Sequence, residues 1–385
     1  MNFHMPTRII FGSGTLALLK GVLKNDLGAG QLFLVTDAGV VEAGLADKVL
    51  SQVGRIETFD GVEPNPRSTT VNRAGEMARK SKPDAILALG GGSAMDAAKA
   101  IALLATNGGV IEDYEGREKY HTPPLPLIAI PTTCGTGSEV TWVSVITDVK
   151  RKFKMSIKGP GMFPAVALID PDLLASLPQS IIASTGLDAL THAIEAYTSK
   201  PANMITDIFA LRAIHQISKA IEGAYENINE DLEAREAIMR GSTMAGIAFG
   251  NSDVAAVHCI SESVGALFDI PHGVANALFL PYVMEFNLPA CRDKYADIAD
   301  TMGIRETDNH SAARKLVEKI KTLSRTLGIP SFRELGIEQS QFPTIAQYAF
   351  QNNSNPSNPR KADVDDYLGI LERAFSEGMG RVQAR

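Results

Sequence analysis

The sequence is poor in cysteine. Cys134, Cys259 and Cys291 are its three cysteines, and no two of them form a CxxC pair. A small, odd number of cysteines without paired spacing excludes a disulfide framework and is typical of a reducing compartment. We therefore expect a cytoplasmic protein.

Long apolar runs are also missing. Residues 1–15 contain no apolar stretch behind a basic start, so we expect no signal peptide. The longest uncharged run near the middle of the chain, residues 121–138, holds four prolines, which exclude a membrane helix there. The sequence thus predicts no membrane partner.

Basic residues are in deficit. The chain has 37 Lys and Arg against 44 Asp and Glu, a net charge of -7, which argues against nucleic acid as a partner. Hydrophobic residues make up 45% and charged residues 21%, as in ordinary soluble enzymes. Because 385 residues exceed what one compact core holds, we expect more than one domain.

The hydrophobic pattern changes near residue 180. Before it, short apolar runs at 32–35, 85–89, 125–130 and 166–169 predict buried parallel strands, with a helix at 93–105 between two of them. After it, runs with helical period cover 181–197, 205–221, 232–249, 312–327 and 364–375. The sequence therefore predicts an α/β domain with a parallel, Rossmann-like sheet at 1–180 and an all-α domain at 181–385.

A glycine-rich turn joins one predicted strand to the following helix. Gly91, Gly92 and Ser93 follow residues 84–90, and such a turn lets a phosphate approach the helix N-terminus. The turn departs from the usual GxGxxG pattern. The alternative is an ordinary tight turn, with Ser93 as the helix N-cap and Asp96 completing a capping box.

Two other strand ends carry residues that suit a nucleotide. Asp37 follows the strand at 32–36, where a carboxylate can bind a ribose 2′-hydroxyl and repel a 2′-phosphate, although it could instead only cap the next helix. Residues 131–138, PTTCGTGS, follow another strand. Three such ends along one sheet edge predict a dinucleotide site.

Four residues of the second half form a candidate metal site. Asp188 and His192 are four apart, so they share a helical face, while His258 lies in an apolar helix and His272 lies at a Pro-His-Gly turn. Each alone is more often a core or surface residue. One oxygen and three nitrogen ligands together suit Fe(II) and also Zn(II).

These segments resemble one known family. GGGSAMDAAKA, PTTCGTGSE, GLDALTHAIEAYTS, VHCISESVGALFDIPHGVANALFLP and the late NPR are similar, in the same order, to the iron-containing (group III) alcohol dehydrogenases. The resemblance spans nearly the whole chain. It implies an N-terminal dinucleotide-binding domain, a C-terminal metal-binding domain, a cleft between them, and a homodimer or larger homo-oligomer.

The resemblance also assigns roles to positions. It implies a metal held by Asp188, His192, His258 and His272, with Phe249 and Val143 lining the substrate pocket. The dinucleotide contacts that it implies are Asp37, Asn65, Gly91, Gly92, Ser93, Thr132, Thr133, Thr136 and Lys154. The family usually has another histidine four residues after the third ligand. Here that position is Glu262, the candidate catalytic residue, which we expect to face the substrate.

The expected activity is reversible, metal-assisted hydride transfer between NAD(H) and a small primary alcohol or aldehyde. NAD and Fe(II), with Zn(II) as an alternative, are the expected cofactors. Other possibilities are a dehydroquinate synthase-like lyase, a glycerol dehydrogenase-like enzyme, or a non-catalytic binding protein with the same fold.

Overall fold

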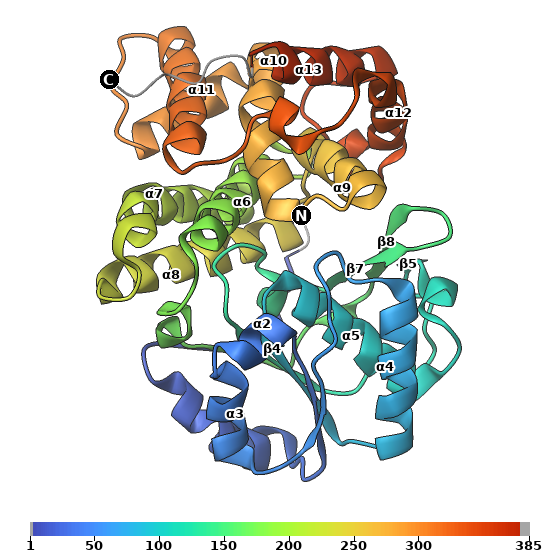
Figure 1. Cartoon of the computed structure of the whole chain (residues 1–385). Helices are drawn as coiled ribbons and strands as arrows, with labels where there is room; N and C mark the ends of the chain where they lie inside the picture. Colours follow the sequence, from blue (N-terminus) through green and yellow to red (C-terminus); the bar gives the residue numbers. More distant parts are fainter. Residues whose placement is uncertain (1–2, 378–385) are drawn as a thin grey trace.

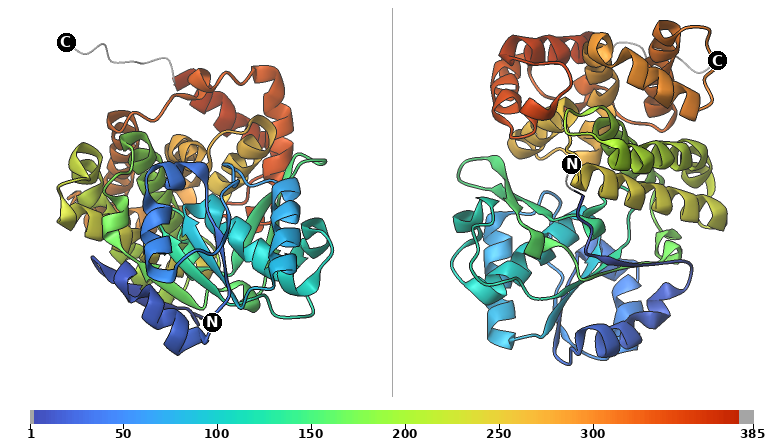
Figure 2. Two further views of the ribbon diagram at one scale, coloured as in Figure 1. Left: turned by 60° about the horizontal axis from the view of Figure 1, so that its bottom comes forward. Right: turned by 180° about the vertical axis from the view of Figure 1, so that it is seen from behind.

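The structure is a computed structural model that describes residues 3–377. The chain forms two lobes, an α/β lobe from its first half and a helical lobe from its second half (Figure 1). The same division is visible from behind in Figure 2. The fold class predicted from the sequence is thus confirmed, while the boundary at residue 180 remains a prediction.

A six-stranded parallel sheet forms the centre of the α/β lobe. Its strand order is β1-β9-β6-β4-β2-β3, with bounds β1 Arg8–Phe11, β2 Leu32–Val35, β3 Glu57–Phe59, β4 Ala85–Gly90, β6 Leu127–Pro131 and β9 Val166–Ile169. Strands β2, β4, β6 and β9 are buried along their whole length. They are apolar throughout because helices cover both faces of the sheet.

Alternate side chains of each strand enter different cores. Phe33 and Ile86 pack with α4, Ser68–Ser81, and α5, Gly92–Asn107, whereas Leu34 and Leu87 pack with α1, Leu19–Val22, α2, Ala38–Glu42, and α3, Leu45–Val53. Because successive side chains of a strand point to opposite faces of the sheet, each apolar run packs against helices on both faces.

A second, smaller sheet was not predicted. Strand β7, Val143–Asp148, pairs antiparallel with β8, Phe153–Lys158, and β8 also pairs with the short β5, Gly116–Arg117. Alternate residues of β7 are buried, so its pattern has the period of a strand with one covered face. This hairpin carries Val143 and Lys154.

Between residues 179 and 377 the chain is helical and forms no strand. The helices are α6 Gln179–Thr198, α7 Met204–Asn227, α8 Leu232–Gly250, α9 Ala256–Phe268, α10 His272–Thr301, α11 Asn309–Thr326, α12 Phe342–Gln351 and α13 Val364–Glu377. One continuous apolar core joins them. None of the described helices is both long enough and apolar enough to cross a membrane.

The capping box that was the alternative interpretation of the glycine turn is absent. Helix α5 begins at Gly92 with Gly91 as its N-cap, so Ser93 lies inside the first turn. The Asp96 carboxylate instead accepts hydrogen bonds from Ser138 Oγ at 2.7 Å and from Val145 N at 2.9 Å. Asp96 thus ties α5 to the segment after β6. Further along the chain, Asn355–Ser357 form a 3-10 turn.

The two lobes meet at the segment that follows β6. A Cβ on Gly135 would come within 2.7 Å of Thr185 Cβ on α6, and one on Gly137 would overlap Gly246 on α8. Phe3, at the start of the described chain, stacks on Phe209 of α7 with ring centroids 5.9 Å apart. Phe3 therefore packs on the helical lobe although it precedes the sheet.

Candidate metal and cofactor site

The carboxyl ends of three neighbouring strands bring the predicted dinucleotide residues together. Strand β4 pairs with β2 on one side and β6 on the other, so Asp37, Gly91 and Thr132 lie along one edge of the sheet. Asp37 caps α2 by accepting a hydrogen bond from Val40 N at 2.9 Å. Burial raises the pKa of the Asp37 carboxyl, although the backbone N–H groups of Val40 and Gly39 oppose this.

Residues 132–138, here called the threonine segment, pack directly on the glycine turn at residues 91–93. A Cβ on Gly91 would lie 3.2 Å from Thr133 Oγ1, and one on Gly92 would overlap the Thr136 side chain. Larger residues at these two positions would therefore push the segments apart. The arrangement leaves bare backbone at the N-terminus of α5, which is the geometry that binds a pyrophosphate.

Asn65, in the loop between β3 and α4, and Lys154, on β8 of the smaller sheet, are hydrogen-bonded to each other. Lys154 Nζ donates to Asn65 Oδ1 at 2.8 Å, and Asn65 Nδ2 donates to Asp269 Oδ1 at 3.0 Å. Asp269 is the C-cap of α9, so this chain of hydrogen bonds crosses between the lobes. Burial lowers the pKa of the Lys154 ammonium, which nearby carboxylates including Glu262 partly offset.

The four predicted metal ligands converge. Ligand atoms of Asp188, His192, His258 and His272 all lie within 4.8 Å of one another. Two of them come from α6, one from α9 and one from the first residue of α10. A Cβ on Gly273 would come within 2.8 Å of Ser184 O, so only glycine lets α10 start this close to α6.

Burial keeps two of the imidazoles neutral at pH 7. It lowers the pKa of His192 to about 4 and that of His272 well below its usual value. Burial also acts to lower the pKa of His258, but the hydrogen bond and charge of Glu195 outweigh it and raise that pKa. Neutral imidazoles offer the lone pairs that a metal needs.

Unpaired polar atoms support a cation at this place. His192 Nδ1, His272 Nδ1 and Asn276 Oδ1 are buried without a hydrogen-bond partner. Asn276 Nδ2 lies 2.6 Å from Asp188 Oδ1 and 3.1 Å from the Nε2 atoms of both His258 and His272. An amide has two protons for these three acceptors, so the cluster holds more lone pairs than its own donors satisfy. The residues fit a divalent cation.

Two residues around the cluster were missed by the sequence analysis. Glu195 binds His258, and Asn276 contacts three of the four ligands. Helical spacing could have found both, because Glu195 lies three residues after His192 and Asn276 lies four after His272.

Of the predicted substrate residues, Phe249 touches a predicted metal ligand directly. Its ring stacks on His192 with centroids 4.4 Å apart. Val143 begins β7, and its backbone oxygen accepts a hydrogen bond from the buried Lys99 at 2.9 Å. Glu262 accepts a hydrogen bond from Asn352 Nδ2 at 2.6 Å and borders a small cavity together with Lys154.

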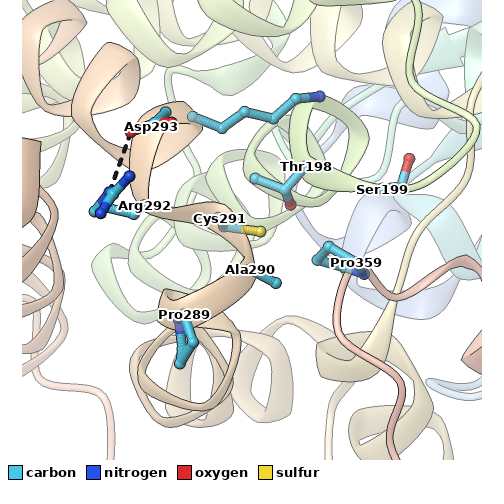
Figure 3. Close-up of a pocket in the computed structure, with 9 residues that line it drawn as sticks. Thr198, Ser199, Pro289, Ala290, Cys291, Arg292, Asp293 and Pro359 are labelled. Carbon is cyan, nitrogen blue, oxygen red and sulfur yellow. Dashed lines mark hydrogen bonds and ion pairs between the residues drawn. The ribbon is translucent and has the colours of Figure 1, made fainter.

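A larger hollow than the one beside Glu262 lies elsewhere (Figure 3). Its volume is about 460 Å³, and it is lined by Thr198, Ser199, Pro289, Ala290, Cys291, Arg292, Asp293, Lys294 and Pro359. Lys294 already donates to the backbone oxygen of Tyr197, and Arg292 pairs with Asp293. The part of α10 that lines the hollow begins at Pro289, which lies 17 residues, or about 25 Å along the helix, after His272. This hollow is therefore separate from the metal cluster.

Comparison with known proteins agrees with this geometry. Residues 6–171 match the model of the iron-containing alcohol dehydrogenases, and residues 182–375 match that of the C-terminal domain of the same family. The chain belongs to the iron-containing alcohol dehydrogenase family. The family predicted from the sequence is thereby confirmed.

Individual relatives match over their whole length. NAD-dependent methanol dehydrogenase from Bacillus methanolicus is 37% identical, with 97% of this chain and 100% of the relative covered. 1,3-Propanediol dehydrogenase from Citrobacter freundii is 39% identical, with 97% and 98% covered. A crystal structure of a 1,3-propanediol oxidoreductase superposes with a TM-score of 0.93 at 38% identity, covering 97% of this chain and 99% of that one.

Family and geometry together establish the general activity. The protein is an oxidoreductase of the alcohol dehydrogenase and aldehyde reductase type, with NAD and a metal ion as cofactors. The individual residues that perform the reaction and the alcohol that it takes are addressed below.

Proposed function

We propose that this enzyme interconverts short primary alcohols and their aldehydes, and that it favours substrates with a second polar or cationic group. We further propose that it works in the cytoplasm as a homodimer or larger homo-oligomer, with domains at 1–180 and 181–385. The short diol handled by the propanediol relatives supports the preference for a polar substrate.

One observation carries the proposal: the segment after β6, which holds predicted dinucleotide contacts, touches α6, the helix that carries two of the predicted metal ligands. Cys134 Sγ, in the threonine segment, lies 3.5 Å from Thr185 Oγ1 on α6, three residues before the ligand Asp188. A dinucleotide on the glycine turn would therefore extend toward the metal ligands. Such proximity is what hydride transfer between a cofactor and a substrate requires.

The proposed role of each residue follows from its position. Asp188, His192, His258 and His272 would hold the cation, which lowers the pKa of an alcohol and polarises an aldehyde carbonyl. The glycine turn and threonine segment would hold the NAD(H), which accepts or donates the hydride. Phe249 lies flat against His192, so it would exclude water from one side of the reacting carbon.

Glu262 supports a polar substrate. It lies four residues after His258 on α9, and its charge acts on both His258 and Lys154. A half-buried carboxylate that has an amide as its hydrogen-bond partner can also accept from a hydroxyl or an ammonium group. We propose that a substrate supplies that second donor.

The test is a substrate panel. Reduction of short aldehydes with NADH, and oxidation of ethanol, 1,3-propanediol and short amino-alcohols with NAD, should show turnover in both directions. Glu262→Gln and Glu262→His should lower kcat/KM for the diol and amino-alcohols more than for ethanol. If neither change alters the ratios across the panel, Glu262 plays no part in specificity.

A matched change on the same helix controls for packing. Ser263 is the buried neighbour of Glu262, and its Oγ donates back to Cys259 O at 2.7 Å. Ser263→Ala should leave the substrate ratios unchanged. The oligomeric state is tested separately, by light scattering on the purified protein.

A further inference from the structure

Glu195 is a buried carboxylate, and the hydrogen-bond partners of both its oxygens lie at the start of α9. It is 3% exposed and lies on α6. Oε1 accepts a hydrogen bond from Val257 N at 2.7 Å, while Oε2 accepts from Ala255 N at 2.8 Å and contacts His258 Nδ1 at 2.6 Å. Two of its partners are backbone N–H groups at the start of α9, and the third is the ring of a metal ligand.

Helix geometry puts this carboxylate beside the metal ligands. At 100° per residue, Asp188, His192 and Glu195 fall within an arc of about 60° on one face of α6. Two of them aim ligand atoms at the cluster. Glu195 instead contacts Nδ1 of the ligand His258. One helix thus supplies two ligands and holds a ligand that belongs to another helix.

The contacts determine which ring nitrogen carries the proton. Both oxygens of Glu195 already accept backbone N–H groups, which can only donate, so the carboxylate is an acceptor toward His258 as well. His258 Nδ1 is then the protonated nitrogen, and Nε2 presents its lone pair to the cluster. Asn276 Nδ2, a donor, lies 3.1 Å from that Nε2 on the opposite side of the ring, which agrees with this tautomer.

We infer that Glu195 is a positioning residue, which fixes the tautomer and orientation of His258 and thereby sets the affinity of the site for its metal ion. This inference rests on the metal centre of the proposed function. Carboxylates that hold a ligand histidine in this way contribute about 10- to 100-fold to metal affinity.

Glu195 also supports the start of α9, and the two roles must be separated. Asn358 provides a matched control, because its Oδ1 accepts from Ala256 N at 3.4 Å and it touches no metal ligand. Asn358→Ala weakens the same helix end without acting on His258. Glu195→Gln keeps the shape of the side chain but replaces one acceptor oxygen with an NH₂ group, which faces the donors of α9 and can reverse the His258 tautomer.

The experiment measures metal binding by the full-length protein without substrate or NAD. The protein is stripped with a chelator, and the affinities for Zn²⁺ and Co²⁺ are measured by competition with a chromophoric chelator. Glu195→Gln should bind each metal about 10- to 100-fold more weakly, and its Co²⁺ complex should show a changed visible spectrum. Glu195→Asp should lie between Glu195→Gln and wild type, and Asn358→Ala should match wild type. The His258 tautomer is read from ¹⁵N chemical shifts of the labelled, metal-free protein.

Each outcome is decisive. If wild type binds neither metal, the proposed metal centre is wrong. If wild type binds but Glu195→Gln binds within twofold of it and keeps the same tautomer, the role given to Glu195 is wrong. An equal loss in Asn358→Ala and Glu195→Gln would assign the effect to the helix end and would also overturn the inference.

Discussion

The two oxygens of Asp37 face different ways. Oδ1 accepts a hydrogen bond from Val40 N at 2.9 Å, and Oδ2 lies 3.1 Å from the place that a Cβ on Gly90 would occupy. One oxygen therefore caps α2 while the other lies beside the strand end that leads into the glycine turn. Capping a helix and contacting a ribose, which the sequence presents as alternatives, are compatible in this geometry.

The position of the Asp37 carboxylate beside the glycine turn predicts a preference for NAD(H) over NADP(H). A carboxylate facing a 2′-phosphate costs on the order of a few kcal/mol, or roughly 10- to 1000-fold in affinity. Asp37→Gly should raise kcat/KM with NADPH relative to NADH. The control is Asp308→Gly, since Asp308 caps α11 in the same way, through His310 N and Ser311 N. If the wild-type enzyme already prefers NADPH, Asp37 acts only as a helix cap.

The ligand cluster predicts loss of metal without loss of fold. His272→Ala removes a ligand from the first residue of α10, where the side chain is partly exposed and contributes little to the core. Metal content should fall to background and NADH-dependent activity should be abolished, with an unchanged circular dichroism spectrum. Metal content equal to that of wild type after purification would contradict the assignment.

Lys99 predicts a pH dependence of stability. Burial lowers its pKa to about 8, while its ammonium donates to Ser138 Oγ at 2.8 Å and to Val143 O at 2.9 Å. The unfolded chain keeps this proton up to about pH 10.4. Between these values the unfolded state binds more protons, so the free energy of unfolding of wild type rises with pH.

Comparison with Lys99→Met isolates this contribution. The stability of wild type relative to the variant should increase by about 2 kcal/mol as the pH rises from 7.5 to 9.5. Urea unfolding at pH 7.5, 8.5 and 9.5 measures the difference. A difference that stays constant over this range would mean that Lys99 titrates in the folded protein as it does in the unfolded chain.

The cysteines should be unreactive in the native enzyme. All three are buried, and burial raises the pKa of the Cys134 thiol to about 11 and that of Cys291 to about 12. At pH 8 a thiol of pKa 11 is ionised in about one molecule in a thousand, and the thiolate is the nucleophile. Ellman's reagent should titrate no thiol in the folded protein and three in urea. Rapid native modification of Cys134 would show that the threonine segment opens.

The sequence by itself determined the family, the fold class and the shared helical face of Asp188 and His192. Asp188 and His192 share a face because an α-helix has 3.6 residues per turn, and the glycine turn follows a strand because its neighbours form a continuous apolar run. Such local regularities can be read from the order of residues alone.

Only the tertiary structure decided the partners of these residues. The capping box at Ser93 and Asp96, the alternative interpretation of the glycine turn, is absent because Asp96 accepts hydrogen bonds from Ser138 and Val145, which lie more than 40 residues further along the chain. Glu195 reaches His258 across 63 residues, and Lys154 reaches Asn65 across 89. A buried polar group forms a hydrogen bond with the donor or acceptor that the packing of distant elements brings within about 3 Å. The helical or strand periodicity of the sequence does not specify which residue that is.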